Sequence, residues 1–493
     1  MGLVVRVHDR LWLPLADMPD DFAAALRAAF TYEDPHYAKM VKMGVQNPGA
    51  PEIENFVVGG GALGLPRGAT KKLRDLAVQH AVDLRFLDRR ARGEPVEWPA
   101  PKMELRPHQV GPVEAAMRRE NCCIRAPTGS GKTLIGCEIA RRAGTTTLIV
   151  VWTQALVTQW RDTLVEKFGW DRRQIGILGE GSRKIRPVTI AMQQSLHRLL
   201  EQGYRFDAFG VVICDELARW GANSLQYDIH RLPARYRVGL SADERRQDGR
   251  DFLVYDAFGE IAAEVPVEAL EVQGAVHKVR VRVVPTDTQD VRWESVEAER
   301  DPRRRAVRRR MERVKLVTRL GEDEARNEVI AKLAADEAAA GHFVLIFSER
   351  VEHCRALADL LRVRGTPCGL LLGGSPWRDR FRETIAGFHA RRLRVAVGTQ
   401  AVYQGLDVPH LDRGIVAAPT ATNRFTLLQQ AGRFSRPAEG KRDAVMYYLW
   451  DRLLFPHHLR ALRKHWPDVE ISGEWDRAGA GRAGGRRVGG RDA

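Results

Sequence analysis

The sequence contains no apolar run that approaches the length of a membrane-spanning helix. The residues that follow Met1 also lack the continuous hydrophobic core of a secretory signal peptide. Together these absences disfavour an integral membrane protein and a secreted one. We therefore expect the protein in the cytoplasm.

Cysteine is scarce, and its spacing disfavours common metal sites. The six cysteines include no CxxC pair, and the adjacent Cys122 and Cys123 do not have the spacing of a zinc knuckle. We expect reduced, mostly buried thiols that behave as small hydrophobic side chains, without structural zinc or an iron–sulfur cluster.

Acidic residues are too few to balance the basic ones. The chain has 78 lysines and arginines against 63 aspartates and glutamates, a net charge of +15. Such an excess favours an anionic partner, either nucleic acid or an acidic membrane surface. Because no membrane segment is evident, nucleic acid is the preferred interpretation.

The chain is long enough for about three domains with cores of their own. We predict a small accessory domain over residues 1–98, a candidate for nucleic-acid binding. It leads into RRARGEPVEWPAP, which is charged and rich in proline and suits a linker. The Gly/Arg-rich residues 471–493 are predicted to be a disordered tail that adds loose attraction to phosphates.

Two blocks of sequence, 99–265 and 326–470, alternate strand-like runs with helical patterns. This alternation predicts an α/β fold with two lobes, each a parallel sheet wrapped by helices. The predicted strands include TTTLIVV, VTIAM, FGVVICDE and RYRVGLSA in the first block and HFVLIFS, RVAVGT, RGIVAAP and AVMYYLW in the second. Between them, residues 266–325 are predicted to connect the lobes. They include a basic segment with helical propensity, Glu299 to Leu320, which is either solvated or in contact with nucleic acid.

The stretch NCCIRAPTGSGKTLIGCEIA has the order strand, Gly-rich turn, helix. Gly129 and Gly131 allow the backbone to curl so that its N–H groups face an anion at the positive end of the helix. In such a cradle Lys132 reaches the β and γ phosphates, and Thr133 binds magnesium. The sequence therefore predicts a nucleotide-binding loop.

An acidic pair follows the apolar strand FGVVIC. Asp215 is predicted to hold the magnesium through water, and Glu216 to orient and deprotonate the attacking water. Upstream, LRPHQ ends at Gln109, whose amide is able to pair with two edges of adenine. Taken alone, LRPHQ is a weak signal.

QQAGRFSRP carries Gln429, Gly432, Arg433 and Arg436 in the pattern QxxGRxxR, which resembles motif VI of superfamily 2 helicases. LRPHQ, APTGSGKT, GLSADERRQDG and GTQAVYQGLDVP precede it in the order of that family. The resemblance covers about Leu105 to Asp451 and looks closest to the branch of XPB-like and phage UvsW-like enzymes and type III restriction motors. It implies two RecA-like lobes with Mg-ATP between them.

The resemblance also implies roles for individual residues. Arg433 and Arg436 would act as arginine fingers on the γ-phosphate. The implied catalytic residues are Lys132, Asp215, Glu216, Gln429, Arg433 and Arg436. Nucleotide contacts would come from Arg106, Gln109, Thr128, Gly129, Ser130, Gly131, Lys132, Thr133 and Asp407, with Thr133 and Asp215 as metal ligands. Strand contacts would come from Thr153, Gln159, Gln194, Thr399 and Gly405.

The chain departs from the family pattern at three positions. Trp152 replaces the usual proline of motif Ia, the segment VVWTQALVTQW. Ala218 stands where His or Asp is usual, and Asp243 stands where motif III usually has threonine. The last two lie in the link between hydrolysis and strand movement, so we expect a complete ATPase core with altered coupling. Ser348, in the FS of motif IV, follows the family.

Two features near the N-terminus resemble binding motifs, GxGxxG and LPRG. Gly59, Gly61 and Gly64 have GxGxxG spacing, but LPRG interrupts the helix that a dinucleotide site needs, so a turn is the better interpretation. LPRG itself is similar to accessory elements of phage and mobile-element helicases. Its Arg67 is therefore a candidate phosphate contact.

The leading hypothesis is an ATP-dependent DNA helicase or translocase. An RNA helicase is the first alternative, because these motifs contact the backbone. The second is a nucleic-acid-binding switch that holds ATP and hydrolyses it slowly. No nuclease motif is evident, so cutting would need a partner protein, such as a nuclease or a replication, repair or defence factor.

Overall fold

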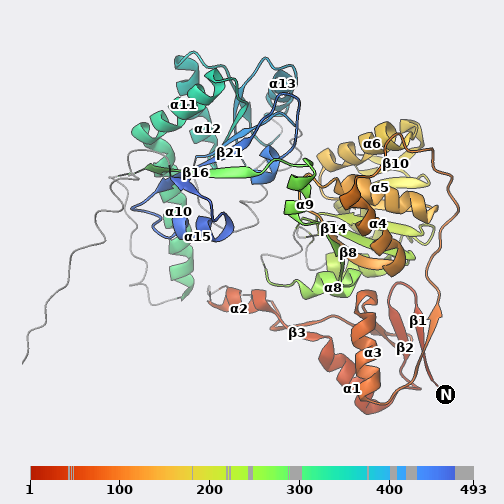
Figure 1. The fold of residues 1–493 in the computed structure, drawn as a ribbon. Coiled ribbons are helices and arrows are strands. Elements are labelled where there is room, and N and C mark those ends of the chain that lie inside the picture. The colour runs from red at the N-terminus through yellow and green to blue at the C-terminus, as the bar shows by residue number, and fades with distance from the viewer. Residues whose placement is uncertain are drawn as a thin grey trace, which may run out of the picture. The chain divides into compact units, whose positions relative to one another are not determined.

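The computed structural model describes residues 2–42, 45, 47, 49–179, 181–217, 220, 224–242, 248–286, 288, 302–374, 377–399, 408–417 and 430–471. The chain forms two compact units, Met1–Gln273 and Gly274–Ala493 (Figure 1). The first unit holds the N-terminal domain and the first α/β lobe, and the second unit holds the second lobe.

The N-terminal domain is a sheet covered by helices on one face. The strands run in the order β5-β6-β2-β1-β7, and a separate pair, β3 and β4, forms a small ribbon. The core lies between the sheet and helices α1 and α3, around Val5, Leu13, Phe22 and Leu73. Element bounds are β1 (Leu3–Val7), β2 (Leu11–Pro14), α1 (Asp20–Ala29), β3 (Thr31–Glu33), α2 (Pro35–Lys42), β4 (Glu52–Glu54), β5 (Val57–Gly59), β6 (Ala62–Leu65), α3 (Thr70–Gln79) and β7 (Leu84–Asp88).

The GxGxxG stretch forms the turn between β5 and β6. Gly60 and Gly61 have φ of 57° and 73°, which residues with a Cβ rarely adopt. The two strands pair in antiparallel fashion from Val57 to Gly59 and from Ala62 to Gly64. The predicted turn is therefore confirmed.

The first lobe is an eight-stranded sheet with the order β11-β10-β12-β9-β13-β14-β8-β15. All neighbours are parallel except β10 and β11. Its elements are α4 (Pro107–Arg119), β8 (Asn121–Arg125), α5 (Lys132–Ala143), β9 (Thr147–Val151), α6 (Gln154–Phe168), β10 (Ile175–Gly179), β11 (Ser182–Lys184), β12 (Val188–Met192), α7 (Gln193–Glu201), β13 (Val211–Asp215), β14 (Tyr236–Ser241), α8 (Phe252–Phe258), β15 (Ile261–Glu264) and α9 (Val267–Val272). The four predicted strands of this block are confirmed.

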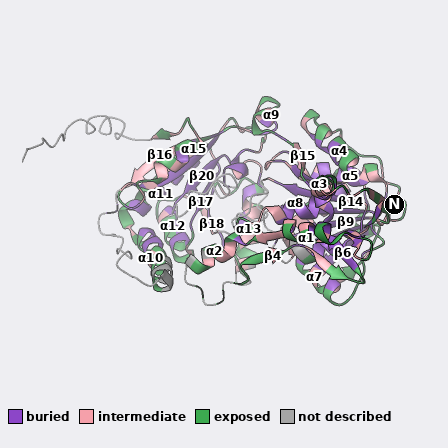
Figure 2. Cartoon of the chain, turned by 90° about the horizontal axis from the view of Figure 1, so that it is seen from below, coloured by how far each residue is buried: buried purple, intermediate pink, exposed green. Residues whose placement is uncertain are grey.

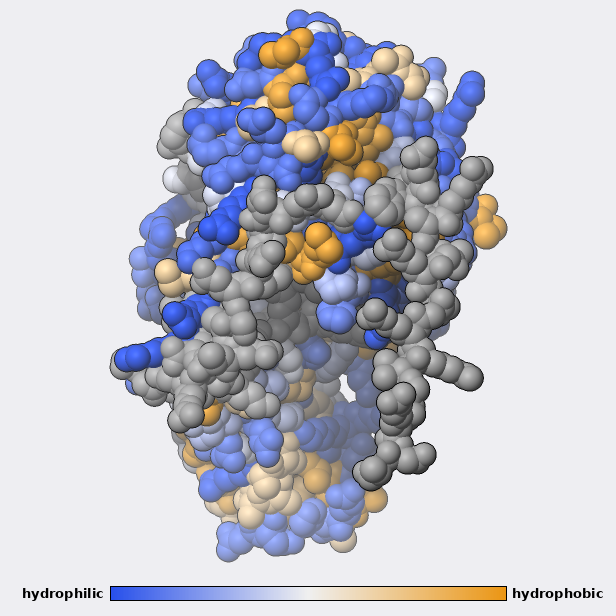
Figure 3. Space-filling model, turned by 90° about the vertical axis from the view of Figure 1, so that its left-hand side faces the viewer, coloured by the Kyte–Doolittle hydropathy of each residue, from blue (hydrophilic) through white to orange (hydrophobic). Residues whose placement is uncertain are grey.

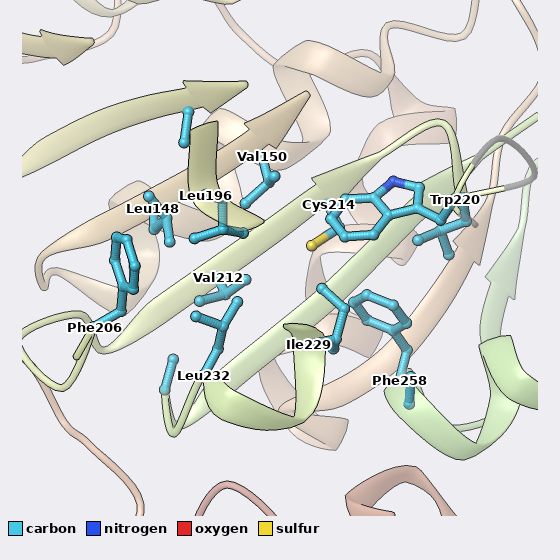
Figure 4. Close-up of a cluster of buried hydrophobic side chains, with 14 of the residues drawn as sticks. Leu148, Val150, Leu196, Phe206, Val212, Cys214, Trp220, Ile229, Leu232 and Phe258 are labelled. Carbon is cyan, nitrogen blue, oxygen red and sulfur yellow. The ribbon is translucent and has the colours of Figure 1, made fainter. Parts of the chain in front are cut away.

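The core of the first lobe explains why its strands are apolar on both faces. Every residue of β9 and β13 is buried, as expected for parallel strands with helices on each side. One cluster gathers around Val212 and Cys214 of β13, with Trp220, Ile229 and Phe258 packed over them (Figure 4). Burying one such side chain contributes about 1.5–3 kcal/mol.

The second unit contains a seven-stranded parallel sheet with the order β18-β19-β17-β20-β21-β16-β22. Its elements are β16 (Val279–Thr286), α10 (Pro302–Glu322), α11 (Glu324–Ala339), β17 (Val344–Phe347), α12 (Val351–Val363), β18 (Cys368–Leu371), α13 (Arg378–His389), β19 (Val395–Gly398), β20 (Arg413–Val416), β21 (Ala444–Asp451), α15 (His458–His465) and β22 (Glu470–Ile471). The four predicted strands are again present.

The segment predicted to connect the lobes, 266–325, is in part a component of the second sheet. β16 lies within it and pairs in parallel with β21 from Val279 to Thr286. Arginines alternate with valines in this strand, and the valines face the core. The predicted basic helix is confirmed as α10. β16 was not predicted, although its alternation is that of a strand.

The expected linker is attached to the first lobe. Ala91 bridges to Ala234 and Pro95 to Thr145, and Trp98 packs edge-on against Trp170 at 5.2 Å between ring centroids. Gly93 lies so close to the lobe that a Cβ there would be 2.3 Å from Thr146 Oγ1. Proline and glycine here allow an extended chain to approach the lobe closely rather than to move freely.

Buried residues concentrate in the sheets and on the helix faces toward them (Figure 2). The described residues visible on one face of the molecule are mostly hydrophilic (Figure 3). Within the described part of the chain, no helix has the length and hydrophobicity to cross a membrane. None of the six cysteines, all of which are described, forms a disulfide. All but Cys368 are buried, which confirms the predicted role as small core residues.

Candidate active site

The predicted phosphate cradle is a tight loop between β8 and α5. Gly129 and Gly131 have φ of 90° and 79°, and Gly131 caps the helix that begins at Lys132. Ser130 is fully buried, and its hydroxyl donates to Pro127 O at 2.7 Å. The loop therefore presents the N-terminus of α5, where unpaired backbone N–H groups favour an anion.

Gln109 holds this loop from α4. Its Oε1 accepts from Arg106 N at 2.9 Å, and its Nε2 donates to Ser130 O at 2.9 Å. Gln109 is 2% exposed, and a Cβ on Gly131 would lie 2.4 Å from its Nε2. The structure thus gives Gln109 a role in shaping the loop, and its contact with adenine stays a prediction.

The acidic pair lies at the carboxyl end of β13, the edge at which parallel sheets bind ligands. Asp215 is 3% exposed, and its Oδ1 accepts from Glu216 N at 2.9 Å. Glu216 has φ of 54°, a left-handed conformation that is strained for a residue with a Cβ. Burial and the nearby Glu216 carboxylate raise the pKa of Asp215.

Two neighbouring residues of α6 hold the predicted metal ligands. Gln159 Nε2 donates to Thr133 Oγ1 at 3.0 Å, and Trp160 Nε1 donates to Asp215 Oδ2 at 2.9 Å. Gln159 was predicted to contact the nucleic-acid strand, and that contact stays a prediction. In the structure its amide nitrogen contacts Thr133 of the phosphate loop.

The residues present fit a divalent metal ion. Thr133 and Asp215 offer hydroxyl and carboxylate oxygens, the donors that small divalent cations prefer. A cation beside the buried Asp215 would also offset the desolvation that disfavours its charged form. Among the described residues, no cluster of three or more His, Cys, Asp or Glu side chains could hold a metal.

The predicted strand contacts in the first unit lie at helix starts. Thr153 is the N-cap of α6, and its Oγ1 accepts from Leu156 N at 3.3 Å. Gln194 is exposed near the start of α7. Its neighbour Gln193 is buried and donates to Ser224 Oγ at 2.6 Å. The structure thus places Thr153 in a capping role, and both strand contacts stay predictions.

The described part of motif VI lies in the second unit. Phe434 is fully buried, and a Cβ on Gly414 would lie 2.3 Å from its ring. Arg433 and Arg436, on either side of this anchor, are half-buried. Lys441 Nζ donates to Arg436 O at 2.7 Å, which fixes the backbone of the segment.

The other predicted residues divide between described and undescribed positions. Thr399 follows β19 and is half-buried. Gly405, Asp407 and Gln429 lie outside the described residues, as do Ala218 and Asp243, on which the prediction of altered coupling depends. Motif IV is described, and Ser348 is buried beside His353 at 3.0 Å between Oγ and Nδ1.

Sequence reasoning missed Trp160 and Trp220. Trp220 Nε1 donates to Asp215 O at 3.0 Å, so two indoles hold one aspartate. A usable signal existed, because a buried indole N–H needs an acceptor and acceptors are rare in an apolar core. Asp215, at the end of the buried strand β13, is such an acceptor.

Arg67 is corrected. It is 3% exposed, and Nη1 donates to Ala234 O at 2.8 Å while Nη2 donates to Asn121 Oδ1 at 2.9 Å. A buried guanidinium that is occupied by the first lobe does not reach a phosphate on the surface. LPRG therefore fastens the N-terminal domain to the lobe.

Two family models match the chain. Residues 102–244 match "Type III restriction enzyme, res subunit", and residues 325–438 match "Helicase conserved C-terminal domain". The chain belongs to the superfamily 2 helicases. Its first-lobe match and its XPB-type relatives point to the branch that contains XPB-like enzymes and type III restriction motors. It is a nucleic-acid-dependent ATPase with two RecA-like lobes.

Individual relatives agree with this assignment. "Probable helicase D10" of Escherichia phage T5 is 26% identical over 376 residues, 76% of each chain. "DNA 3'-5' helicase XPB" of Kineococcus radiotolerans is 28% identical over 70% of this chain, which spans 59% of that protein. The structure of S. cerevisiae Dbp5 bound to RNA and ADP BeF3 aligns with a TM-score of 0.53 over 76% of this chain and 96% of that one. At 14% identity, this last likeness concerns the fold alone.

Proposed function

We propose that this superfamily 2 helicase uses Mg-ATP to move on DNA, as a helicase or translocase. The observation that carries the proposal is the α6 connection in the first lobe. One helix holds Thr133 of the phosphate loop and Asp215 of the acidic pair at once. Such an arrangement serves a nucleotide whose phosphates and metal lie between the two elements.

Each residue has a proposed role in hydrolysis. Lys132 binds the β and γ phosphates, and Glu216 orients the attacking water and takes its proton. When bound, magnesium would be held by Thr133 and Asp215 and would neutralise phosphate charge. Arg433 and Arg436 would stabilise the charge that develops on the γ-phosphate.

The choice of DNA is supported by relatives of the XPB type, whose names describe DNA helicases and translocases. The net charge of +15 suits binding to either DNA or RNA. The match of the first lobe to the res subunit of type III restriction enzymes supports a partner protein such as a nuclease subunit. The chain spans about three-fifths of the length of its XPB relatives.

The test is steady-state ATP hydrolysis with no nucleic acid, single-stranded DNA, duplex DNA or RNA. We expect stimulation by DNA that is lost in Lys132→Ala. Lys184→Ala, an exposed lysine on the edge strand β11, is the matched control and should behave as wild type. Stimulation by RNA alone would contradict the DNA assignment, and slow hydrolysis that no nucleic acid stimulates would favour the ATP switch.

A further inference from the structure

We propose that Gln159 and Trp160, the last two residues of motif Ia, are positioning residues that orient both metal ligands. The inference rests on the proposed function, because it assigns residues that set the geometry of the Mg-nucleotide site. It adds a physical route by which a strand bound at motif Ia affects hydrolysis.

The two hydrogen bonds restrict the ligands directly. The Thr133 hydroxyl has two lone pairs, and accepting from Gln159 Nε2 leaves one in a fixed direction for a cation. Asp215 accepts from Glu216 N through Oδ1 and from Trp160 Nε1 through Oδ2. With one donor on each oxygen, the plane of the carboxylate is fixed before any cation binds.

The Trp160 ring also sets the distance between the elements that carry these ligands. Trp160 is fully buried. A Cβ on Gly136 of α5 would lie 2.4 Å from its Cη2, so the ring packs directly against the backbone of that helix. Gly136 is one turn beyond Thr133. The same indole thus contacts the helix of one ligand and bonds the side chain of the other.

A second contact joins motif Ia to Asp215 through Trp152, which lies before α6. Trp152 precedes the N-cap Thr153, and its ring packs edge-on against Trp220 at 6.0 Å between centroids. Trp220 Nε1 donates to Asp215 O. A displacement of motif Ia therefore reaches Asp215 by two routes. Trp160 acts on the Asp215 side chain, and Trp152 acts through Trp220 on the Asp215 backbone carbonyl.

The experiment measures the affinity for ADP with and without Mg²⁺, by calorimetric titration, in wild type, Trp160→Phe and Gln159→Met. Phenylalanine keeps an aromatic ring and loses the N–H donor, and methionine keeps the length of glutamine without its amide. We expect each variant to lose about tenfold of the affinity that Mg²⁺ adds, the size of one hydrogen bond to a charged or metal-bound group. Affinity without the metal should stay as in wild type.

The matched control is Trp170→Phe. Trp170 is also buried in the first unit, and its Nε1 has no hydrogen-bond partner in the described structure. Trp170→Phe removes an indole N–H but leaves the hydrogen bonds of Thr133 and Asp215 in place. The affinity for ADP that Mg²⁺ adds should therefore not change. The variants should also lower the ratio of DNA-stimulated to basal ATP hydrolysis, and Trp170→Phe should not.

Two outcomes separate this inference from the proposed function. If Lys132→Ala abolishes hydrolysis while Trp160→Phe and Gln159→Met keep the wild-type gain from Mg²⁺, the positioning role is wrong and the ATPase stands. If Lys132→Ala hydrolyses ATP as wild type does, the proposed function itself fails. Because Gln159 lies at the surface of α6, its variant is a second test if Trp160→Phe does not fold.

Discussion

The Tyr32 hydroxyl donates a hydrogen bond of 2.8 Å to Asp256 Oδ2, which ties the N-terminal domain to α8 of the first lobe. Asn55 Nδ2 donates to the same oxygen at 2.7 Å, and the Tyr32 and Phe252 rings stack at 4.1 Å between centroids. The N-terminal domain is thus part of the first unit, and β3 and β4 contact the helix that follows motif III.

Asp256→Ala should destabilise the first unit by about 3 kcal/mol, because two donors at a buried carboxylate lose their acceptor. Urea unfolding measures the loss, and limited proteolysis should cut faster between the N-terminal domain and the lobe. Asp75→Ala, at an exposed position of α3, is the control and should unfold as wild type. Equal stability of both variants would show that the carboxylate does not hold the interface.

Arg67→Lys should lower stability without changing how DNA affinity depends on salt. Lysine keeps the positive charge but lacks the fork that reaches Ala234 O and Asn121 Oδ1 together. The measurement is the midpoint of thermal unfolding together with the slope of log Kd against log salt concentration. A second variant, Arg67→Ala, also removes the charge. If Arg67 contacted a phosphate of DNA, this variant would reduce the slope by about one, and that result would contradict its burial as a structural residue.

Glu216→Gly should be more stable than Glu216→Ala by about 1 kcal/mol, because glycine adopts the left-handed backbone at this position without strain. Both variants should lose ATP hydrolysis, since each lacks the proposed base. Chemical unfolding gives the comparison. At Glu166, inside the helix α6, the order should reverse, with glycine about 1 kcal/mol less stable than alanine. The same order at both positions would argue against strain at Glu216.

Stability of the second unit should fall with acid because of His353. Its Nε2 donates to Asn327 Oδ1 at 2.8 Å and its Nδ1 accepts from Ser348, so the ring is held neutral. Burial, with a smaller effect of the Arg326 charge, lowers the pKa of His353 from 6.5 to about 3. Between these values only the unfolded state binds the proton. The contribution is therefore complete above pH 6.5 and is lost toward pH 3, by about 1.4 kcal/mol per pH unit.

The measurement for His353 is the free energy of unfolding from pH 7.5 to 5 in wild type and His353→Gln. The free energy of unfolding of His353→Gln should depend less steeply on pH than that of wild type, whatever the stability of the variant at neutral pH. His457→Gln, at an exposed histidine, is the control and should keep the wild-type dependence. Parallel curves for wild type and His353→Gln would exclude the buried ring as the cause.

Local patterns predicted the parts of the fold that depend on neighbours in the chain. The run VTIAM became β12 with the same bounds, and the glycines of APTGSGKT adopted the backbone that a phosphate loop needs. β16 was missed because residues 266–325 were assigned as a whole to the connection between the lobes. That strand is defined by pairing with β21, whose Ala444 faces Val279 from far along the chain.

The sequence by itself determined the phosphate loop, the acidic pair and the order of the helicase motifs, because each depends on residue types at short, fixed spacing. The tertiary structure alone decided that Trp160 bonds Asp215, that Gln159 bonds Thr133, and that Arg67 is buried at Ala234. The physical reason is that a buried donor must find an acceptor, and which acceptor lies within reach depends on how distant segments pack.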